Sequence, residues 1–466
     1  MIEISNYIGG EWTPSVSGRT FERRNPADER EVVGVAPESD AKDVHTAVAA
    51  VATGYPEWAA RTPETRADVL YRAADLLAAR ADELAVELVR EEGKTLAEAR
   101  TETRRTPANL RFYAGEALRL AGQTFASADG LVLTAREPVG VVGAITPWNF
   151  PLNIPSRKLG PALAAGNGVV FKPSEVTPLL GQRLVEVLVE AGVPAGALAL
   201  VQGGAEAGAA LVADEQVDAV TFTGSYAVGA AIHRAVAPTV RCQLEMGGKN
   251  AVVVLDDADA GDLGRAASIV MRGAFGLSGQ ACTGTSRLIV HEAVHDELVA
   301  RITAAAAKLR VGNGLDDGVD MGPLATPAQL EKVAAYVPVD PPEHGHFVPP
   351  TVITGVTPDE PVAQDEIFGP VLAVLRVRSF EEAVAVANAT QYGLSAGIVT
   401  RDVGRALAFA RRVDAGVIKV NQPTTGVAMN APFGGVKNSS TQTFKEQAGE
   451  TMMHFYTVDK TVYLSS

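Results

Sequence analysis

Short apolar stretches alternate with helical stretches over residues 139–255, and this alternation strongly limits the folds that the chain can adopt. The apolar stretches have few polar interruptions, which is typical of strands buried on both faces. The predicted strands are Val139–Ile145, Val169–Phe171, Leu198–Val201, Ala219–Phe222 and Ala251–Leu255, and the helices predicted between them are Pro155–Ala165, Leu179–Glu190, Ala205–Val212 and Ala227–Ala235. This order predicts an α/β fold with a parallel sheet, which binds ligands at the carboxyl ends of its strands.

Composition narrows the classes of function. A chain of 466 residues, 47% of them hydrophobic, is too long for one core, so we expect about two or three domains. The net charge of -14 argues against nucleic acid or an anionic membrane as a partner, because phosphate binding needs basic clusters. The two cysteines cannot build a disulfide framework, residues 1–6 do not resemble a signal peptide, and no apolar run could span a bilayer. We therefore expect a cytoplasmic protein that acts on a small molecule.

One cysteine, Cys282, stands among small residues in the stretch Gly279–Arg287, where its sulfur has room to be approached. A thiolate attacks a carbonyl carbon well and needs only a modest fall in pKa to form near neutral pH. Free cysteines in cytosolic proteins are also commonly buried for packing alone. The stretch by itself leaves both interpretations open.

Further motifs follow the predicted strands, where the ligand of a parallel sheet would lie. They are Thr146–Pro151, Lys172–Glu175, Thr223–Gly229 and Leu244–Asn250, and later in the chain Glu366–Pro370 and Pro432–Gly435. Together with the cysteine stretch, and in this order over nearly the whole chain, these motifs resemble the aldehyde dehydrogenase superfamily.

The resemblance implies an aldehyde dehydrogenase-like α/β architecture with a parallel-sheet cofactor domain, an α/β catalytic domain and a small β extension. Residues 1–117 and 137–246 would form the NAD(P)-binding domain, and residues 247–437 the catalytic domain. Residues 118–136 and 451–466 would join subunits into a homodimer or homotetramer.

The resemblance also assigns the chemistry of aldehyde oxidation. Cys282 would attack the aldehyde carbon, and the Asn149 side chain with the Cys282 backbone N–H would hold the oxyanion. Glu245 would activate the water that hydrolyses the thioester. The branch of the superfamily that passes its acyl group to coenzyme A generally lacks this acid, so we expect a free acid as product.

Cofactor positions carry over in the same way, although the chain has no GxGxxG fingerprint, which the family does without. Glu175 would repel a 2′-phosphate whereas Lys172 and Ser174 could bind one, so both NAD and NADP stay open. The residues matched to cofactor binding are Trp148, Lys172, Ser174, Glu175, Gly224, Ser225, Glu366 and Phe368.

For the substrate, Arg157 stands where relatives that act on uncharged aldehydes often have an aromatic residue. An arginine there resembles the arrangement of succinic semialdehyde dehydrogenases, in which it pairs with a substrate carboxylate; the alternative is a surface arginine in an ion pair. Phe150 is the second residue expected to contact the substrate. The segments 275–278, 432–446 and 455–463 resemble the α-ketoglutaric semialdehyde (2,5-dioxovalerate) branch of the family.

The predicted reaction is therefore oxidation of 2,5-dioxovalerate to 2-oxoglutarate, with succinic semialdehyde or a broad range of aldehydes as alternatives. A non-catalytic protein that keeps the fold and a thiol hydrolase are alternatives of other classes. His291–His295 reads as HExxH, but it directly follows the predicted strand Leu288–Val290, so we expect no metal site. Residues 337–346 stand where relatives usually carry a longer segment.

Overall fold

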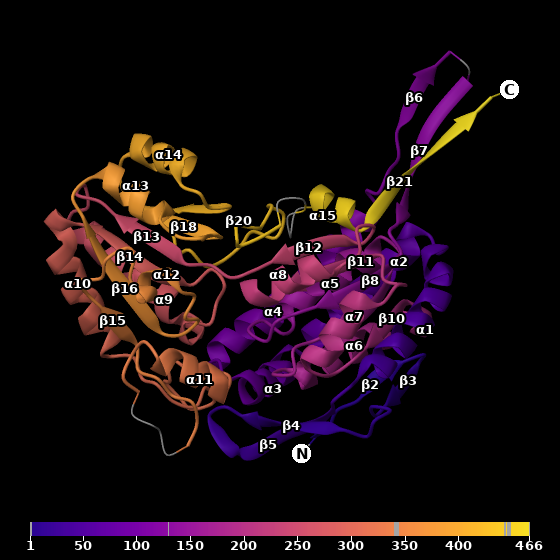
Figure 1. Ribbon diagram of the computed structural model, residues 1–466, viewed down its shortest axis with the longest axis horizontal. Coiled ribbons are helices and arrows are strands. Elements are labelled where there is room, and N and C mark those ends of the chain that lie inside the picture. Colours follow the sequence, from indigo (N-terminus) through magenta and orange to yellow (C-terminus); the bar gives the residue numbers. More distant parts are fainter. Residues whose placement is uncertain (1, 129, 340–343, 442–443, 445–448, 466) are drawn as a thin grey trace.

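A computed structural model describes residues 2–128, 130–339, 344–441, 444 and 449–465. The ribbon forms two α/β lobes, and a narrow β arm projects from the lobe that contains the N-terminus (Figure 1). Among the described residues, no helix has the length and apolar character needed to cross a membrane.

The first lobe is built on a seven-stranded sheet with the order β12-β11-β8-β9-β10-β2-β3. The five strands from β12 to β10 are parallel, and an antiparallel hairpin, β2 and β3, closes one edge. Gly9 and Gly10 make the hairpin turn with φ of 62° and 96°, which other residues rarely adopt. The strands are β2 (Asn6–Ile8), β3 (Glu11–Thr13), β8 (Val141–Ile145), β9 (Gly168–Lys172), β10 (Leu198–Leu200), β11 (Ala219–Thr223) and β12 (Arg241–Glu245).

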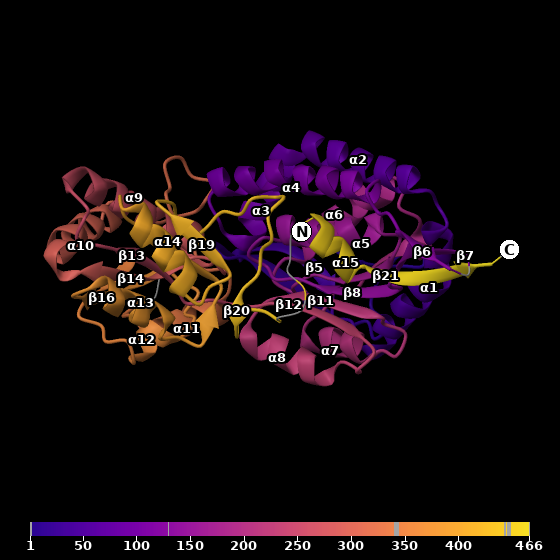
Figure 2. The ribbon, with the colours of Figure 1, turned by 90° about the horizontal axis from the view of Figure 1, so that it is seen from above.

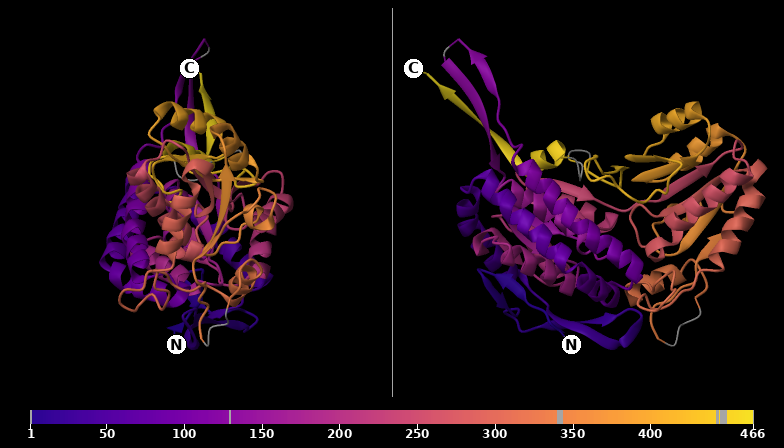
Figure 3. Two further views of the ribbon diagram at one scale, coloured as in Figure 1. Left: turned by 90° about the vertical axis from the view of Figure 1, so that its left-hand side faces the viewer. Right: turned by 180° about the vertical axis from the view of Figure 1, so that it is seen from behind.

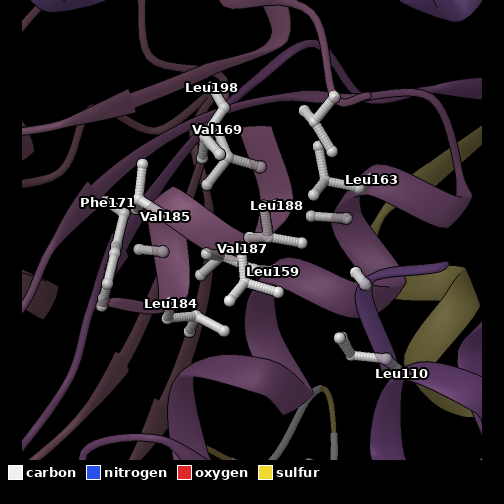
Figure 4. Close-up of a cluster of buried hydrophobic side chains, with 14 of the residues drawn as sticks. Leu110, Leu159, Leu163, Val169, Phe171, Leu184, Val185, Val187, Leu188 and Leu198 are labelled. Atoms are coloured by element: carbon white, nitrogen blue, oxygen red, sulfur yellow. The ribbon is translucent and has the colours of Figure 1, made fainter. Parts of the chain in front are cut away.

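Helices cover both faces of this sheet, as the continuous apolar strands predict (Figure 2). Along β9, Val169 and Phe171 join the core formed with α2, α4, α5 and α6, whereas Val170 points into the core under α1, α7 and α8. Figure 4 shows the first of these cores. The helices are α1 (Ala41–Ala59), α2 (Pro63–Ala79), α3 (Ala81–Glu92), α4 (Leu96–Ala117), α5 (Asn153–Ala164), α6 (Pro178–Glu190), α7 (Ala205–Ala213) and α8 (Tyr226–Ala235), with a short 3-10 helix η1 (Ala195–Ala197).

A smaller sheet with the order β1-β5-β4 lies along the base of the first lobe (Figure 3). It consists of β1 (Ile2–Glu3), β4 (Thr20–Asn25) and β5 (Asp28–Pro37). The helices that follow it begin at capping side chains: Asp40 caps α1, Thr62 caps α2, and Thr95 with Glu98 forms a capping box at α4.

The second lobe is built on a six-stranded, wholly parallel sheet with the order β15-β16-β14-β13-β18-β19. Its faces divide along β13 as in the first lobe, with Val253 packed toward α11, α13 and α14 and Val252 toward α9 and α10. The strands are β13 (Asn250–Val254), β14 (Thr285–His291), β15 (Thr351–Ile353), β16 (Val371–Val377), β18 (Ser395–Val399) and β19 (Val417–Val420). The helices are α9 (Ala260–Phe275), α10 (Glu292–Ala306), α11 (Pro327–Ala334), α12 (Pro361–Gln364), α13 (Phe380–Asn388) and α14 (Val403–Arg412).

Three further strands form the arm, in the order β21-β7-β6. Their bounds are β6 (Thr124–Ser127), β7 (Gly130–Pro138) and β21 (Thr457–Leu464), and α15 (Gly449–Phe455) leads into the last of them. β17 (Tyr392–Gly393) and β20 (Val436–Lys437) make a small antiparallel pair beside the second sheet.

The predicted fold class, a parallel-sheet α/β architecture, is confirmed, and the predicted strands and helices are present with end shifts of a few residues. The fifth predicted strand, β13, lies in the second sheet, so the chain changes sheets between Glu245 and Asn250. That this change marks a domain boundary near residue 246 stays a prediction. The shortened segment at 337–346 is only partly visible, because residues 340–343 lie outside the described residues.

Candidate active site

Cys282 stands where two cavities meet. A cavity of about 380 Å³ and a cavity of about 150 Å³ both have Cys282, Ile154 and Thr223 in their walls. The cysteine can therefore be approached from two sides, which suits a nucleophile that must contact a substrate on one side and a second reactant on the other.

The backbone just before Cys282 is unusual. Leu277 and Ser278 have φ of 54° and 53°, in the left-handed region that costs free energy for residues other than glycine, and Gly279 follows with φ of 71°. These residues form the short helix η2 (Gly276–Gly279). Outside contacts hold the turn: the Glu98 carboxylate accepts the Leu277 N–H at 2.7 Å, and the Ser278 hydroxyl donates to the carbonyl of Gly322 at 2.7 Å.

A β-carbon at position 279 would lie 2.0 Å from the carbonyl oxygen of Gly369, so the close approach of these two loops requires glycine. After the turn, the Asn250 side chain donates to the carbonyl oxygens of Cys282 and Gly284 at 2.8 and 2.9 Å. The segment 277–284 around Cys282, the nucleophile loop, is thus held by Glu98 from the first lobe and by Asn250 from the second.

Asn149, the predicted oxyanion ligand, is buried and tied to the nucleophile loop. Its side-chain N–H donates to the carbonyl of Gln280 at 2.9 Å. Its own carbonyl accepts a hydrogen bond of 2.8 Å from the Lys94 ammonium, which also contacts Glu102 at 2.7 Å. The Lys94 and Glu102 side chains are each 1% exposed. The backbone of Asn149 is therefore held by a desolvated ion pair.

The larger cavity contains the residues predicted to contact the substrate. Phe150 and Arg157, which follows on α5, line it with Cys282 and Thr283. Arg105 from α4 and Phe433 from the C-terminal segment complete much of the wall. Arg157 is 7% exposed.

The smaller cavity contains a group of the residues predicted to bind the cofactor: Trp148, Gly224, Ser225, Glu366 and Phe368. The Trp148 and Phe368 rings meet edge to face with centroids 5.5 Å apart.

Glu366 accepts the N–H of Gly248 at 3.0 Å, and a β-carbon at position 247 would lie 1.9 Å from its carboxylate, so the glycine pair makes room for this side chain. Burial raises the pKa of Glu366 above its ordinary value.

Lys172 ends β9, and Ser174 and Glu175 follow it. None of the three is in the wall of either cavity that contains Cys282. The Lys172 ammonium donates to the carbonyls of Pro173 and Gly203 at 2.8 and 2.6 Å, and burial lowers its pKa. The Glu175 carboxylate is 3.8 Å from this ammonium and half exposed. Lys172, Ser174 and Glu175 therefore lie at the carboxyl end of β9, in the same sheet as the strands that lead to the smaller cavity.

Glu245, the predicted base, ends β12 and is 1% exposed. Its carboxylate accepts a hydrogen bond of 2.7 Å from the Ser440 hydroxyl. The segment around Ser440 runs against the end of β12, where Met246 donates its N–H to the carbonyl of Ser439 at 2.8 Å. In this arrangement, Glu245 is not among the described residues that line either cavity.

Comparison with known proteins settles the family. The family model described as "Aldehyde dehydrogenase family" matches residues 12–462. The chain belongs to this family. The resemblance inferred from the motifs is thereby confirmed, and so is the predicted fold.

This aldehyde dehydrogenase is similar to two curated relatives named after one substrate. It is 42% identical over 480 residues to the alpha-ketoglutaric semialdehyde dehydrogenase of Bacillus subtilis, covering 98% of this chain and 97% of the relative. It is 43% identical over 466 residues to the 2,5-dioxopentanoate dehydrogenase of Saccharolobus solfataricus, covering 96% of each chain. A solved NAD-dependent aldehyde dehydrogenase from Sinorhizobium meliloti superposes with a TM-score of 0.95 at 37% identity, covering 100% of this chain and 95% of that one.

Sequence reasoning did not find four side chains that shape the site of this aldehyde dehydrogenase: Lys94, Glu102, Arg105 and Ser440. Lys94 and Glu102 read as ordinary charged residues on a helical segment, and only tertiary packing buries them. Glu98, Glu102 and Arg105 are spaced along α4 so that they share one helix face, and they line the larger cavity together. This spacing is the sequence pattern that could have indicated them.

The HExxH residues of this aldehyde dehydrogenase have other roles. His291 caps α10 by accepting the N–H of Ala293, and His295 contacts Asp296 and Arg376. Among the residues that the structure describes, no cluster of three or more His, Cys, Asp or Glu side chains could hold a metal ion.

Proposed function

We propose that this aldehyde dehydrogenase oxidises 2,5-dioxovalerate, the α-ketoglutaric semialdehyde, to 2-oxoglutarate with NAD or NADP. The observation that carries the proposal is that Arg157 and Cys282 line one cavity, so an arginine can bind a carboxylate while the cysteine attacks the aldehyde at the other end of a short substrate. The names of the relatives from Bacillus subtilis and Saccharolobus solfataricus support the same substrate.

In the first step the Cys282 thiolate attacks the aldehyde carbon and the carbonyl oxygen becomes an oxyanion. The Asn149 amide and the Cys282 backbone N–H hold that oxyanion, and donors of this kind commonly lower a barrier by about 3–4 kcal/mol. The buried Lys94 keeps the Asn149 backbone in place through its carbonyl. Loss of hydride from the former aldehyde carbon leaves a thioester on Cys282.

The residues of the smaller cavity fit a nicotinamide dinucleotide. The glycine pair at 247–248 lets the Glu366 carboxylate lie against the backbone, and the N-terminus of α8 behind Ser225 presents N–H groups to an anion such as a pyrophosphate. Lys172 and Glu175 would hold the adenine-side ribose, and Glu366 the nicotinamide ribose. When bound, the dinucleotide supplies the hydride acceptor.

Glu245 completes the reaction as the base that takes a proton from the hydrolytic water. Water oxygen bonds to the acyl carbon, the bond to Cys282 sulfur breaks, and the free acid leaves. A positioned general base typically contributes about a hundredfold or more. The contact with Ser440 provides a resting position for this carboxylate before the thioester forms.

Formation of NAD(P)H with 2,5-dioxovalerate, succinic semialdehyde and pentanal tests the proposal. Cys282→Ser should lower kcat by about a thousandfold or more with each aldehyde, because a hydroxyl is a far weaker nucleophile. Cys242→Ser is the matched control, since Cys242 lies on β12 outside both cavities. An active Cys282→Ser protein would overturn the mechanism.

Arg157→Leu tests the substrate assignment in the same assay. Arg157→Leu should lower kcat/KM for 2,5-dioxovalerate by about tenfold to a hundredfold relative to pentanal, because a charged hydrogen bond to the carboxylate is lost. Equal use of pentanal and 2,5-dioxovalerate by the wild-type enzyme would refute the carboxylate-bearing substrate. A preference for succinic semialdehyde would favour the alternative function, which a single arginine also fits.

We also propose that the enzyme is a homodimer or homotetramer joined through the arm, and that it works in the cytoplasm. Both edges of the three-stranded arm sheet are open within the described part of the single chain, and an open edge is a template for pairing with another strand. The chain has two cysteines, too few for a disulfide framework, in keeping with a reducing compartment.

A further inference from the structure

The larger cavity at Cys282 has four charged side chains in its wall: Glu98, Glu102, Arg105 and Arg157. The two acids have fixed partners within the protein. Glu98 accepts the N–H groups of Thr95 and Leu277, at 3.0 and 2.7 Å. Glu102 accepts the Lys94 ammonium at 2.7 Å and the N–H groups at the start of α5 at 3.0 and 3.1 Å. Neither acid is paired with Arg105, so the acids of the wall do not neutralise it.

Arg105 is only partly buried, and among the residues that the structure describes its guanidinium donates to the carbonyl of Val427 on the facing loop. No described acid lies within ion-pair distance of its guanidinium. Burial lowers the pKa of Arg105, as expected for a cation that has lost water without gaining a carboxylate.

A third cation stands behind the same loop. Lys419 on β19 donates to the carbonyl of Gly426 at 2.6 Å. Burial and the neighbouring Arg105 lower its pKa, so the two cations are close enough to act on each other. Arg105 and Lys419, on either side of the loop at 425–427, therefore give this side of the cavity a positive potential, and an anion that enters the cavity would be attracted to it.

We propose that Arg105 is a second specificity-determining residue, which binds the 2-oxo acid end of the substrate together with Arg157. This inference rests on the proposed function. A 2-oxo acid presents a carboxylate and an adjacent ketone oxygen, more acceptors than one guanidinium fork satisfies, whereas succinic semialdehyde is shorter and lacks the ketone. Two arginines on neighbouring helices of one cavity therefore select the longer oxo acid over the simple semialdehyde.

The experiment compares wild type, Arg105→Leu and Arg105→Lys, with Arg104→Leu as the matched control. Arg104 is the adjacent residue of α4, is exposed and lies 3.5 Å from Asp82, away from the cavity. The kcat/KM ratio of 2,5-dioxovalerate to pentanal should fall by about tenfold to a hundredfold in Arg105→Leu and by less in Arg105→Lys, which keeps the charge but not the fork. The ratio should not change in Arg104→Leu.

Inhibition by products gives a readout that does not depend on turnover of the semialdehyde. With pentanal as substrate, 2-oxoglutarate should inhibit wild type more strongly than succinate does, and Arg105→Leu should weaken inhibition by 2-oxoglutarate more than inhibition by succinate. Thermal melting of each variant checks that the cavity is still folded.

The outcomes separate this inference from the proposed function. If wild type prefers 2,5-dioxovalerate and Arg105→Leu keeps that preference, Arg105 has no part in specificity and only this inference fails. If Arg105→Leu lowers turnover of all aldehydes equally, its role is structural and the inference also fails. If wild type does not prefer 2,5-dioxovalerate over pentanal, the substrate assignment itself is wrong.

Discussion

Two buried lysines near the site of this aldehyde dehydrogenase differ in what surrounds their charge. Burial lowers the pKa of Lys94, but Glu102 and Glu92 outweigh it and the net shift is upward, so this ammonium stays charged. Lys249 is 2% exposed, and its ammonium has no hydrogen-bond partner among the described residues. Burial, with Arg287 adding to it, lowers the pKa of Lys249 to about 7. At the residue scale, the same side chain is a fixed support in one place and a titrating group in the other.

The pH dependence of stability should reveal Lys249. Its folded pKa of about 7 lies below the ordinary 10.5, so between these values the unfolded chain binds more protons and stability rises with pH, by up to about 1.4 kcal/mol per pH unit. Lys249→Met should remove this rise and should be more stable than wild type below pH 7. Calorimetric melting of both proteins from pH 6 to 10 measures this change in stability.

The control for that measurement is Lys308→Met, which changes the same residue type at an exposed position. It should melt in parallel with wild type over the whole pH range. If Lys249→Met also runs parallel to wild type, Lys249 is not a buried titrating group.

At the scale of elements, two helices of the first lobe begin at acids supplied by other helices. α5 has no side-chain cap of its own; instead the Glu102 carboxylate of α4 accepts the N–H groups of Leu152 and Asn153. α6 likewise begins where Glu91 of α3 accepts the N–H groups of Leu179 and Leu180 at 2.7 and 3.0 Å. These contacts satisfy N–H groups that a helix start otherwise leaves without partners.

Loss of the Glu102 cap should affect the aldehyde, because α5 follows Asn149 and carries Arg157. Loss of the Glu91 cap should affect the dinucleotide, because α6 follows the Lys172–Glu175 segment. Glu102→Gln and Glu91→Gln each replace one acceptor oxygen, and each should cost about 1–3 kcal/mol of stability. Glu102→Gln should lower kcat and raise the KM for the aldehyde. Glu91→Gln should mainly raise the KM for the dinucleotide.

Steady-state kinetics with each reactant varied in turn distinguishes the two effects, and chemical denaturation measures the loss of stability. Identical kinetic changes in both variants would mean that the caps stabilise the lobe as a whole and position neither group of residues.

At the scale of the whole molecule, the arm exposes apolar side chains that the rest of the chain does not cover. Phe125 is 46% and Tyr463 is 77% exposed, and both lie beside Val132, which pairs with each of them across the sheet. Leu131 and Leu464 pair on the other face, 45% and 50% exposed. Apolar surface on both faces of a projecting sheet is typical of a contact between subunits.

Charges on the arm should therefore break the assembly. Phe125→Glu with Tyr463→Glu should give a smaller particle mass in sedimentation velocity than wild type, because burying two carboxylates in a subunit contact is costly. Val403→Glu with Leu407→Glu is the control: these α14 residues are 72% and 53% exposed and lie in the other lobe (Figure 1). An unchanged mass for the arm variant would exclude the arm as the subunit contact.

The sequence by itself determined the α/β class, the strands β8 to β11 with the helices between them, and the family. These follow from apolar periodicity and short motifs, which depend on residues close together in the chain. Where tertiary contacts intervene, element ends move: α5 begins at Asn153, two residues before its predicted start, because Glu102 caps it from another helix.

Only the tertiary structure decided which side chains meet at Cys282. Motifs identified Cys282 and Arg157 separately, and folding brought them into one cavity with Arg105, which no motif marked. The same folding turned Glu245 toward Ser440, buried Lys94 with Glu102, and placed Lys172 away from the nucleophile. Such neighbours are distant in the chain, and their meeting depends on how sheets and helices pack, which local patterns do not specify.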